Sequence, residues 1–178
     1  MKTYVTYGFF WAAGGMVLTL ALYFLGFHAN VEKLAVSNWV GGIGGLAIAV
    51  TCLVLGTKAR SAEVPPNEAF GYGRALGSGV MIALFAALFG LVAGFIYMKF
   101  VNPGFVDVMV QAQLSKMEAK GASAAQLDQA EKMIRAFSGP VISNCFNAVF
   151  GFIIGVVLAL ITSAFLKREA VEEPPAIA

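Results

Sequence analysis

The chain has 178 residues, of which 59% are hydrophobic and only 12% charged, and its formal net charge is +2. Soluble domains carry about 25% charged residues, so this chain has too little polar surface to cover a water-soluble globule. Its basic residues are few and scattered, which excludes the footprint of a nucleic-acid-binding protein. We therefore expect membrane lipid to surround much of the chain, and we expect no nucleic-acid partner.

The first apolar stretch carries no charged side chain from residue 3 to residue 27. A signal peptide has a shorter apolar region, about 7–15 residues, followed by a small-residue cleavage site. We therefore predict a retained membrane helix at residues 7–25. A short loop at 26–38 follows and carries His28, which we interpret as an interfacial residue and not as a ligand or a base.

The second predicted span, residues 39–56, is short and rich in glycine at its start. Glycine is tolerated in membrane helices because a broken backbone hydrogen bond is costly in lipid. Lys58 and Arg60 close the span. The Pro65-Pro66 pair that follows cannot lie inside a helix and marks a linker.

The third predicted span is the most regular, because residues 75–98 contain no charged side chain. As a helix this run is about 36 Å long, enough to cross a hydrocarbon core of about 30 Å. Tyr72 and Tyr97 lie near its two ends. Aromatic side chains favour the headgroup region, so we expect both tyrosines at the membrane surface.

Residues 102–138 form a long polar stretch with apolar residues at helical spacing. Asn102 and Pro103 are suited to start a helix, Gly121 to end it, and Ser123 to cap a second one. We predict two amphipathic helices that rest on the bundle, on the membrane surface or on a partner; a mobile loop with partial helix is the alternative. The candidate partner-binding residues are Val106, Val110, Leu127 and Ile134.

The fourth predicted span covers residues 141–166 and ends at Lys167-Arg168. The tail, 169–178, contains a second proline pair and is predicted to be disordered. The fold class is therefore an all-α integral membrane protein, with four transmembrane helices in a compact bundle and one domain over residues 1–178.

The basic residues divide equally between the two sides that four spans define. The positive-inside rule gives most weight to charges close to the span ends. Lys58, Arg60, Arg74 and the Lys167-Arg168 pair adjoin spans on the side of the termini, against mainly Lys99 and Arg135 on the other. We therefore expect cytoplasmic termini and an extracytoplasmic 102–138 segment.

Each span also carries a stripe of small residues at helical spacing. In lipid such residues let helix backbones approach closely, within one chain or between chains. The candidate helix-packing residues are Gly41, Gly45, Gly90, Gly94, Gly151 and Gly155. Residues 40–45 resemble residues 150–155, which suggests two duplicated helical hairpins, although chance matching in a small apolar alphabet explains the likeness equally well.

No Asp, Glu, Lys, Arg or His lies within the predicted spans, which argues against a proton-coupled pump or a pore for charged solutes. The sequence holds no phosphate-cradling loop, no histidine pair for a metal and no nucleophile–base arrangement. We therefore expect no enzymatic activity and no cofactor or metal. The most polar intramembrane patch is Ser143, Asn144 and Asn147, which serves either for interhelical hydrogen bonds or as a site for a small ligand or lipid headgroup.

The stretch Asn67-Glu68-Ala69-Phe70-Gly71 and the exit Tyr97-Met98-Lys99-Phe100-Val101-Asn102-Pro103-Gly104-Phe105 resemble the bacterial membrane family known as domain of unknown function 4199. The resemblance implies four helices in a bacterial inner membrane. It carries no activity and no site residues. Gly104 departs from the family pattern, which often has an acidic residue at this position.

Two functions remain open from the sequence. The first is a non-enzymatic structural or accessory membrane component that binds a protein partner through the 102–138 segment or the small-residue faces. The alternative is a transporter or channel for a small neutral solute, acting as a homo-oligomer.

Overall fold

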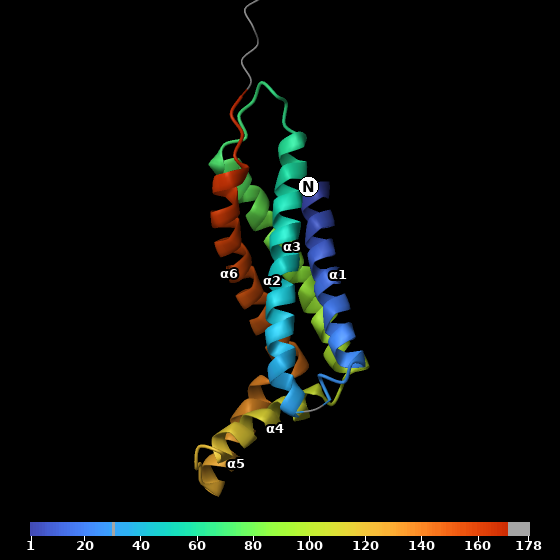
Figure 1. Cartoon of the computed structure of the whole chain (residues 1–178), viewed down its shortest axis with the longest axis vertical. Helices are drawn as coiled ribbons and strands as arrows, with labels where there is room; N and C mark the ends of the chain where they lie inside the picture. Colours follow the sequence, from blue (N-terminus) through green and yellow to red (C-terminus); the bar gives the residue numbers. More distant parts are fainter. Residues whose placement is uncertain (30, 171–178) are drawn as a thin grey trace, which may run out of the picture.

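The computed structural model describes residues 1–29 and 31–170; all named elements in this part of the chain are helices, and it has no named strand (Figure 1). Four helices are long and apolar enough to cross a membrane. They are α1 (Lys2–Phe24), α2 (Val31–Ala62), α3 (Tyr72–Ile96), which continues into a π-helical turn (Tyr97–Val101), and α6 (Pro140–Leu166). Two shorter helices, α4 (Phe105–Glu118) and α5 (Ala124–Phe137), lie between α3 and α6.

The four long helices lie side by side in one bundle (Figure 1). Helix α3 packs most extensively, against α6 and α1, and α2 packs against α1, α3 and α6. The N-terminus lies at the same end as the connection between α2 and α3 and the end of α6, whereas α4 and α5 lie at the opposite end (Figure 1). We call these the terminal end and the loop end.

The terminal half of the bundle holds a densely packed core. Leu53, Ile82 and Ala159, from α2, α3 and α6, are fully buried there, and Tyr7 and Trp11 of α1 pack against them. Small residues make this packing possible. A Cβ atom built on Gly79 of α3 would lie only 2.6 Å from the Cβ of Ala159, so glycine is required at that contact.

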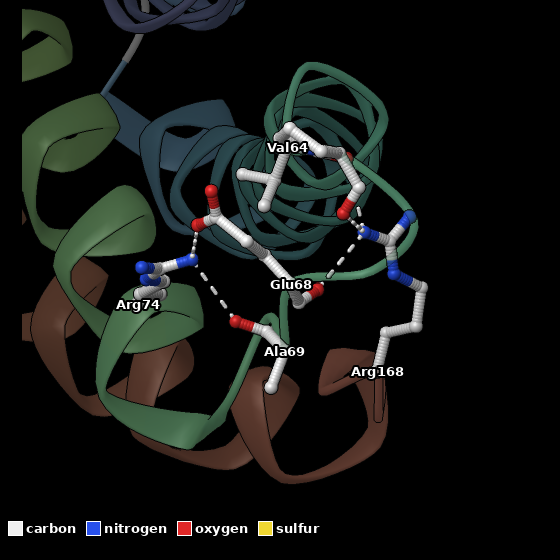
Figure 2. Close-up of polar contacts among 6 residues, drawn as sticks. Val64, Glu68, Ala69, Arg74 and Arg168 are labelled. Atoms are coloured by element: carbon white, nitrogen blue, oxygen red, sulfur yellow. Dashed lines mark hydrogen bonds and ion pairs between the residues drawn. The ribbon is translucent and has the colours of Figure 1, made fainter. Parts of the chain in front are cut away.

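Polar contacts tie the chain segments together at the terminal end (Figure 2). Arg168, just after α6, donates to the carbonyls of Val64 (3.0 Å) and Pro65 (3.1 Å) in the α2–α3 connection. Its backbone also exchanges two hydrogen bonds of 2.9 Å with Phe70. The end of α6 is thereby held against the start of α3.

Helix α2 is longer than the predicted span 39–56, because it begins at Val31 and ends at Ala62. Hydropathy marks the lipid-facing part of a helix, whereas the helix itself continues until a residue interrupts it. Residues 31–38 contain neither proline nor glycine, and Glu32 in the first turn is favourable at a helix N-terminus. The connection between α1 and α2 is therefore shorter than the predicted loop at 26–38, because residues 31–38 belong to α2.

The 102–138 segment contains the two predicted helices, and Gly121 and Ser123 have the predicted roles. Gly121 separates the helices with a φ of +82°, and Ser123 forms a capping box with Gln126 at the start of α5. The predicted start at Asn102-Pro103 is wrong, because α4 begins at Phe105. Asn102 instead accepts a hydrogen bond from the Phe105 backbone in a turn. The tail predicted to be disordered covers residues 169–178, of which residues 171–178 lie outside the described part of the chain.

The end of α3 differs most from expectation. The backbone N–H of Asn102 donates to the Tyr97 carbonyl at 2.8 Å, which closes a wide π-type turn. Tyr97 is 4% exposed and lies inside the bundle, so its predicted position at the membrane surface is wrong. Tyr72, at the other end of α3, is exposed as expected.

Candidate functional site

A cavity of about 590 Å³ lies between the four long helices, in the loop half of the bundle. Small residues make up most of its wall. A Cβ atom built on Gly45, Gly90 or Gly151 would meet no atom within 4 Å, so these glycines face open space. The volume therefore exists because α2, α3 and α6 present glycine and alanine where larger side chains would fill the bundle.

The six candidate packing glycines differ in how closely they approach a neighbouring helix. Gly94 and Gly155 lie against a neighbouring helix: a Cβ at Gly155 would approach the Ala83 Cβ to 2.6 Å, and one at Gly94 would overlap the Asn144 side chain. Gly41 has an ordinary contact with Leu22 at 3.7 Å. Gly45, Gly90 and Gly151 line the cavity and bring no helices together.

Of the three residues in the predicted polar patch on α6, two line the cavity and one does not. Asn144 is buried and lines the cavity, and its Nδ2 donates to the Pro140 carbonyl at 2.5 Å. Asn147, almost one turn further along, also lines the cavity, and none of the described residues hydrogen-bonds to its amide. Ser143 does not line the cavity and donates to the Gly139 carbonyl at 3.1 Å. Two of the three predicted residues therefore meet at one site.

A buried polar cluster forms the loop-end wall of the cavity. His28, in the connection between α1 and α2, is 7% exposed, and its Nδ1 lies 2.5 Å from the Tyr97 hydroxyl oxygen. Asn102 donates its amide N–H to the same oxygen at 3.0 Å. Because the Asn102 amide nitrogen only donates, the Tyr97 proton remains available to the Nδ1 of a neutral His28.

Aromatic packing holds this cluster in place. The His28 ring lies 5.7 Å from the Tyr97 ring and 5.1 Å from the Phe105 ring, measured between centroids. Burial lowers the pKa of His28 below its usual value, so the imidazole is neutral at neutral pH. The expectation of an interfacial histidine is wrong, because His28 is buried against Tyr97 and Phe105. The sequence signal was the presence of Tyr97, Asn102 and Phe105 within one motif.

The cavity is closed at one end and accessible at its side. Towards the terminal end, the core of Leu53, Ile82 and Ala159 fills the bundle. Along α6, Asn147 and Gly151 line the cavity and are also exposed, as is Gly42 of α2. The hollow therefore communicates with the lateral surface of the bundle.

The residues of the candidate partner-binding stripe lie at the loop end. Val110 is 1% exposed and is packed within the protein, where α4 contacts α2 and α5. Val106, Leu127 and Ile134 are half-buried. The apolar side chains that α5 leaves exposed are instead Met133 and Phe137.

These features define a class: an all-helical protein with four helices of membrane-spanning length around a cavity that has a polar end. The chain belongs to the family described as "Protein of unknown function (DUF4199)", whose match covers residues 6–168. The resemblance noted from residues 67–105 is thus confirmed over nearly the whole chain. Neither the curated proteins nor the solved structures contain a match.

Proposed function

We propose that this protein is a multi-pass protein of the bacterial inner membrane, with both termini in the cytoplasm and α4 and α5 outside. Four apolar helices support this placement, as does the position of the N-terminus and the end of α6 at one end of the bundle (Figure 1). Lys58, Arg60 and Arg74 adjoin the helix ends on that side, which agrees with the positive-inside rule.

Within that membrane, we propose that the central cavity binds a small neutral molecule with a polar end and an apolar body. The single observation that carries this function is the cavity itself. Its volume of about 590 Å³ lies within the range of about 300–1,000 Å³ that is typical of ligand sites. Among the described residues, no carboxylate, ammonium or guanidinium group lines it, so a charged ligand would lose its hydration without gaining a counter-charge.

The distribution of polar groups indicates how such a molecule is oriented. The amides of Asn144 and Asn147 and the ring of His28 line the cavity, and amides and imidazoles bind hydroxyl, carbonyl or amide groups of a ligand. Thr19, Ser37 and Asn38 add further polar groups, and the rest of the wall is mainly apolar and suits a hydrocarbon body. The lateral exposure of Asn147 and Gly151 favours entry of the ligand from the lipid phase.

We further propose that binding occurs without catalysis. His28 is the one imidazole in the cavity wall, and its hydrogen-bond partner is the Tyr97 hydroxyl and not a serine or cysteine side chain. This pairing supports a role in ligand recognition.

The decisive test is to identify and quantify small molecules that co-purify with the protein in mild detergent. The variant Gly90→Leu places a side chain in the cavity and is expected to lose at least ten-fold of the bound molecule. Gly73→Leu is the matched control, because Gly73 lies on the same helix, also faces open space and does not line the cavity. Equal ligand content in the two variants would contradict cavity binding.

A carrier for a small neutral solute, acting as a homo-oligomer, is a second candidate function. The observation that favours it is that the cavity is accessible on one side and closed on the other by the Leu53, Ile82 and Ala159 core. Transport then requires this core to open. Flux into proteoliposomes is the measurement, and Asn144→Leu is expected to abolish it while the protein remains folded.

An accessory role with a protein partner is supported by the exposed side chains of Met133 (58%) and Phe137 (59%) on α5. Replacing both with serine is expected to release a partner that co-purifies with the wild-type protein. If the partner still co-purified with this variant, the exposed α5 side chains would not be its binding site.

A further inference from the structure

A second pocket, of about 550 Å³, lies at the terminal end of the bundle. Its wall comes from the first turn of α1, the last turn of α2, the connection to α3 and the first turns of α3. Unlike the central cavity it is charged, since Arg60, Glu63, Glu68 and Arg74 all line it. Two positive and two negative side chains therefore face one hollow.

Arg60 is held in a defined position by its neighbours. Its Nε donates to the Tyr4 hydroxyl at 3.0 Å, and its Nη1 donates to Glu63 at 2.7 Å. Glu63 in turn accepts a hydrogen bond from the Thr3 hydroxyl, and this bond and the Arg60 guanidinium keep the pKa of Glu63 below its usual range. The Nη2 of Arg60 has no partner among the described residues.

Arg74, which also lines the pocket, is held in a similar way by Glu68 and Ala69 (Figure 2). Its Nη1 donates both to Glu68, at 2.9 Å, and to the Ala69 carbonyl, at 3.1 Å. The Nε and Nη2 groups of Arg74 have no partner among the described residues. Each guanidinium group is therefore held in place by some of its N–H groups, and its other N–H groups remain free to bind a ligand.

The free groups match a particular ligand chemistry. Guanidinium groups bind phosphate oxygens with directed hydrogen bonds, and carboxylates bind ammonium groups in the same way. Each carboxylate oxygen accepts more than one hydrogen bond, so Glu63 and Glu68 retain capacity after binding their arginines. The four charges already form two ion pairs and sum to zero. A ligand that carries both signs therefore keeps the pocket neutral, whereas an anion adds negative charge beside two carboxylates.

We propose that this pocket binds the phosphoethanolamine headgroup of a membrane phospholipid, with the phosphate at Arg60 and Arg74 and the ammonium at Glu63 and Glu68. The inference rests on the membrane placement proposed above, which puts the terminal end of the bundle at the level of the headgroups. A phosphocholine headgroup is a poorer ligand, because its quaternary ammonium has no N–H to donate to a carboxylate.

The test is native mass spectrometry of the full chain in detergent with an equimolar mixture of phosphatidylethanolamine, phosphatidylglycerol and phosphatidylcholine of identical acyl chains. Wild-type protein is expected to retain phosphatidylethanolamine at least three-fold over the other two. Arg74→Gln is expected to remove this preference, whereas Lys58→Gln, at the same end of α2 but outside the pocket, leaves it unchanged. Glu68→Gln is expected to shift retention towards phosphatidylglycerol.

Equal retention of the three lipids, or equal behaviour of Arg74→Gln and Lys58→Gln, would overturn the assignment. Competition separates a lipid headgroup from a free anion: soluble phosphoethanolamine is expected to displace the lipid, and inorganic phosphate displacing it equally well would overturn the zwitterion site. Because the Arg74–Glu68 pair is about half exposed, Arg74→Gln is expected to fold. Gly77→Leu, which fills the pocket without removing a charge, provides an independent variant.

The outcome is independent of the central cavity. Gly90→Leu is expected to lose the cavity ligand and to retain phosphatidylethanolamine. A protein without a cavity ligand but with the lipid preference would therefore contradict the function proposed for the cavity and leave the headgroup site intact.

Discussion

At the scale of single residues, His28 links the loop-end cluster to pH. Burial lowers its pKa in the folded protein below the value of 6.5 expected in the unfolded chain. The unfolded state therefore binds the proton more readily, and the free energy of unfolding decreases as the pH falls through 6.5 towards the lowered pKa. Well above pH 6.5 the histidine is neutral in both states and this dependence disappears.

We expect the unfolding temperature in detergent to fall between pH 7.5 and pH 5, and to fall less in His28→Gln. Glutamine retains a polar side chain but does not titrate in this range. Parallel curves for the two proteins would show that the acid sensitivity arises from other groups.

Tyr97 offers a second test at this scale. Tyr97→Phe removes a hydroxyl that pairs with both His28 and Asn102 inside the protein. Leaving buried partners without a hydrogen bond costs about 1–3 kcal/mol, so the variant is expected to unfold at lower temperature or denaturant concentration. Tyr72→Phe is the matched control, because the Tyr72 hydroxyl donates to the Leu160 carbonyl at an exposed position. A larger loss in Tyr72→Phe would contradict the structural role of the cluster.

At the scale of helices, the sequence predicted the boundaries that are set by capping residues, prolines and charges next to the helix ends. Helix α6 begins at Pro140 after Gly139 and ends at Leu166, close to the predicted 141–166, because proline at the first position and Lys167 beyond the end are encoded in the sequence. The capping role of Ser123 was predictable for the same reason.

Two features at this scale were not predicted from the sequence. One is the π-turn at Tyr97–Val101, where Tyr97 lies against His28, 69 residues away in the chain. Apolar composition also does not predict the N-terminal extension of α2, because a helix outside lipid tolerates charged residues such as Glu32 and Lys33.

The capping box of α5 gives a prediction for this scale. Ser123→Ala removes the side-chain acceptor for the Gln126 backbone N–H, and losing such a cap typically costs about 1 kcal/mol. Faster amide hydrogen exchange in the first turn of α5 is the expected result. Ser115→Ala in α4 is the control, since alanine has the higher helix propensity there and no cap is lost. Equal exchange in both variants would argue that tertiary contacts alone hold α5.

At the scale of the whole molecule, the bundle is divided into a packed half and a hollow half. Both halves are rich in small residues, and a stripe of glycine alone does not distinguish them. Gly155 adjoins Ala83 with no room for a side chain, whereas Gly151, one turn away on α6, faces open space. The sequence therefore predicted where two helices are able to approach closely. It did not predict at which of these positions the helices are in contact. In the membrane placement proposed above, the hydrophobic effect does not drive helices together, and the close contacts of the terminal half supply the van der Waals attraction that holds the bundle.

This division predicts opposite effects for one substitution at two neighbouring positions. Gly155→Leu forces α6 away from α3, because a Cβ alone would come within 2.6 Å of Ala83 and 3.1 Å of Trp11. Overpacking of this kind costs about 1–3 kcal/mol, and we expect a lowered unfolding temperature or aggregation in detergent. Gly151→Leu places the same side chain in the cavity, so it is expected to fold with wild-type stability and to lose the bound molecule. Size-exclusion profiles, thermal unfolding and ligand content measured on both variants provide the comparison. If Gly151→Leu is as unstable as Gly155→Leu, then α6 is packed along its whole length and the cavity is filled in the folded protein.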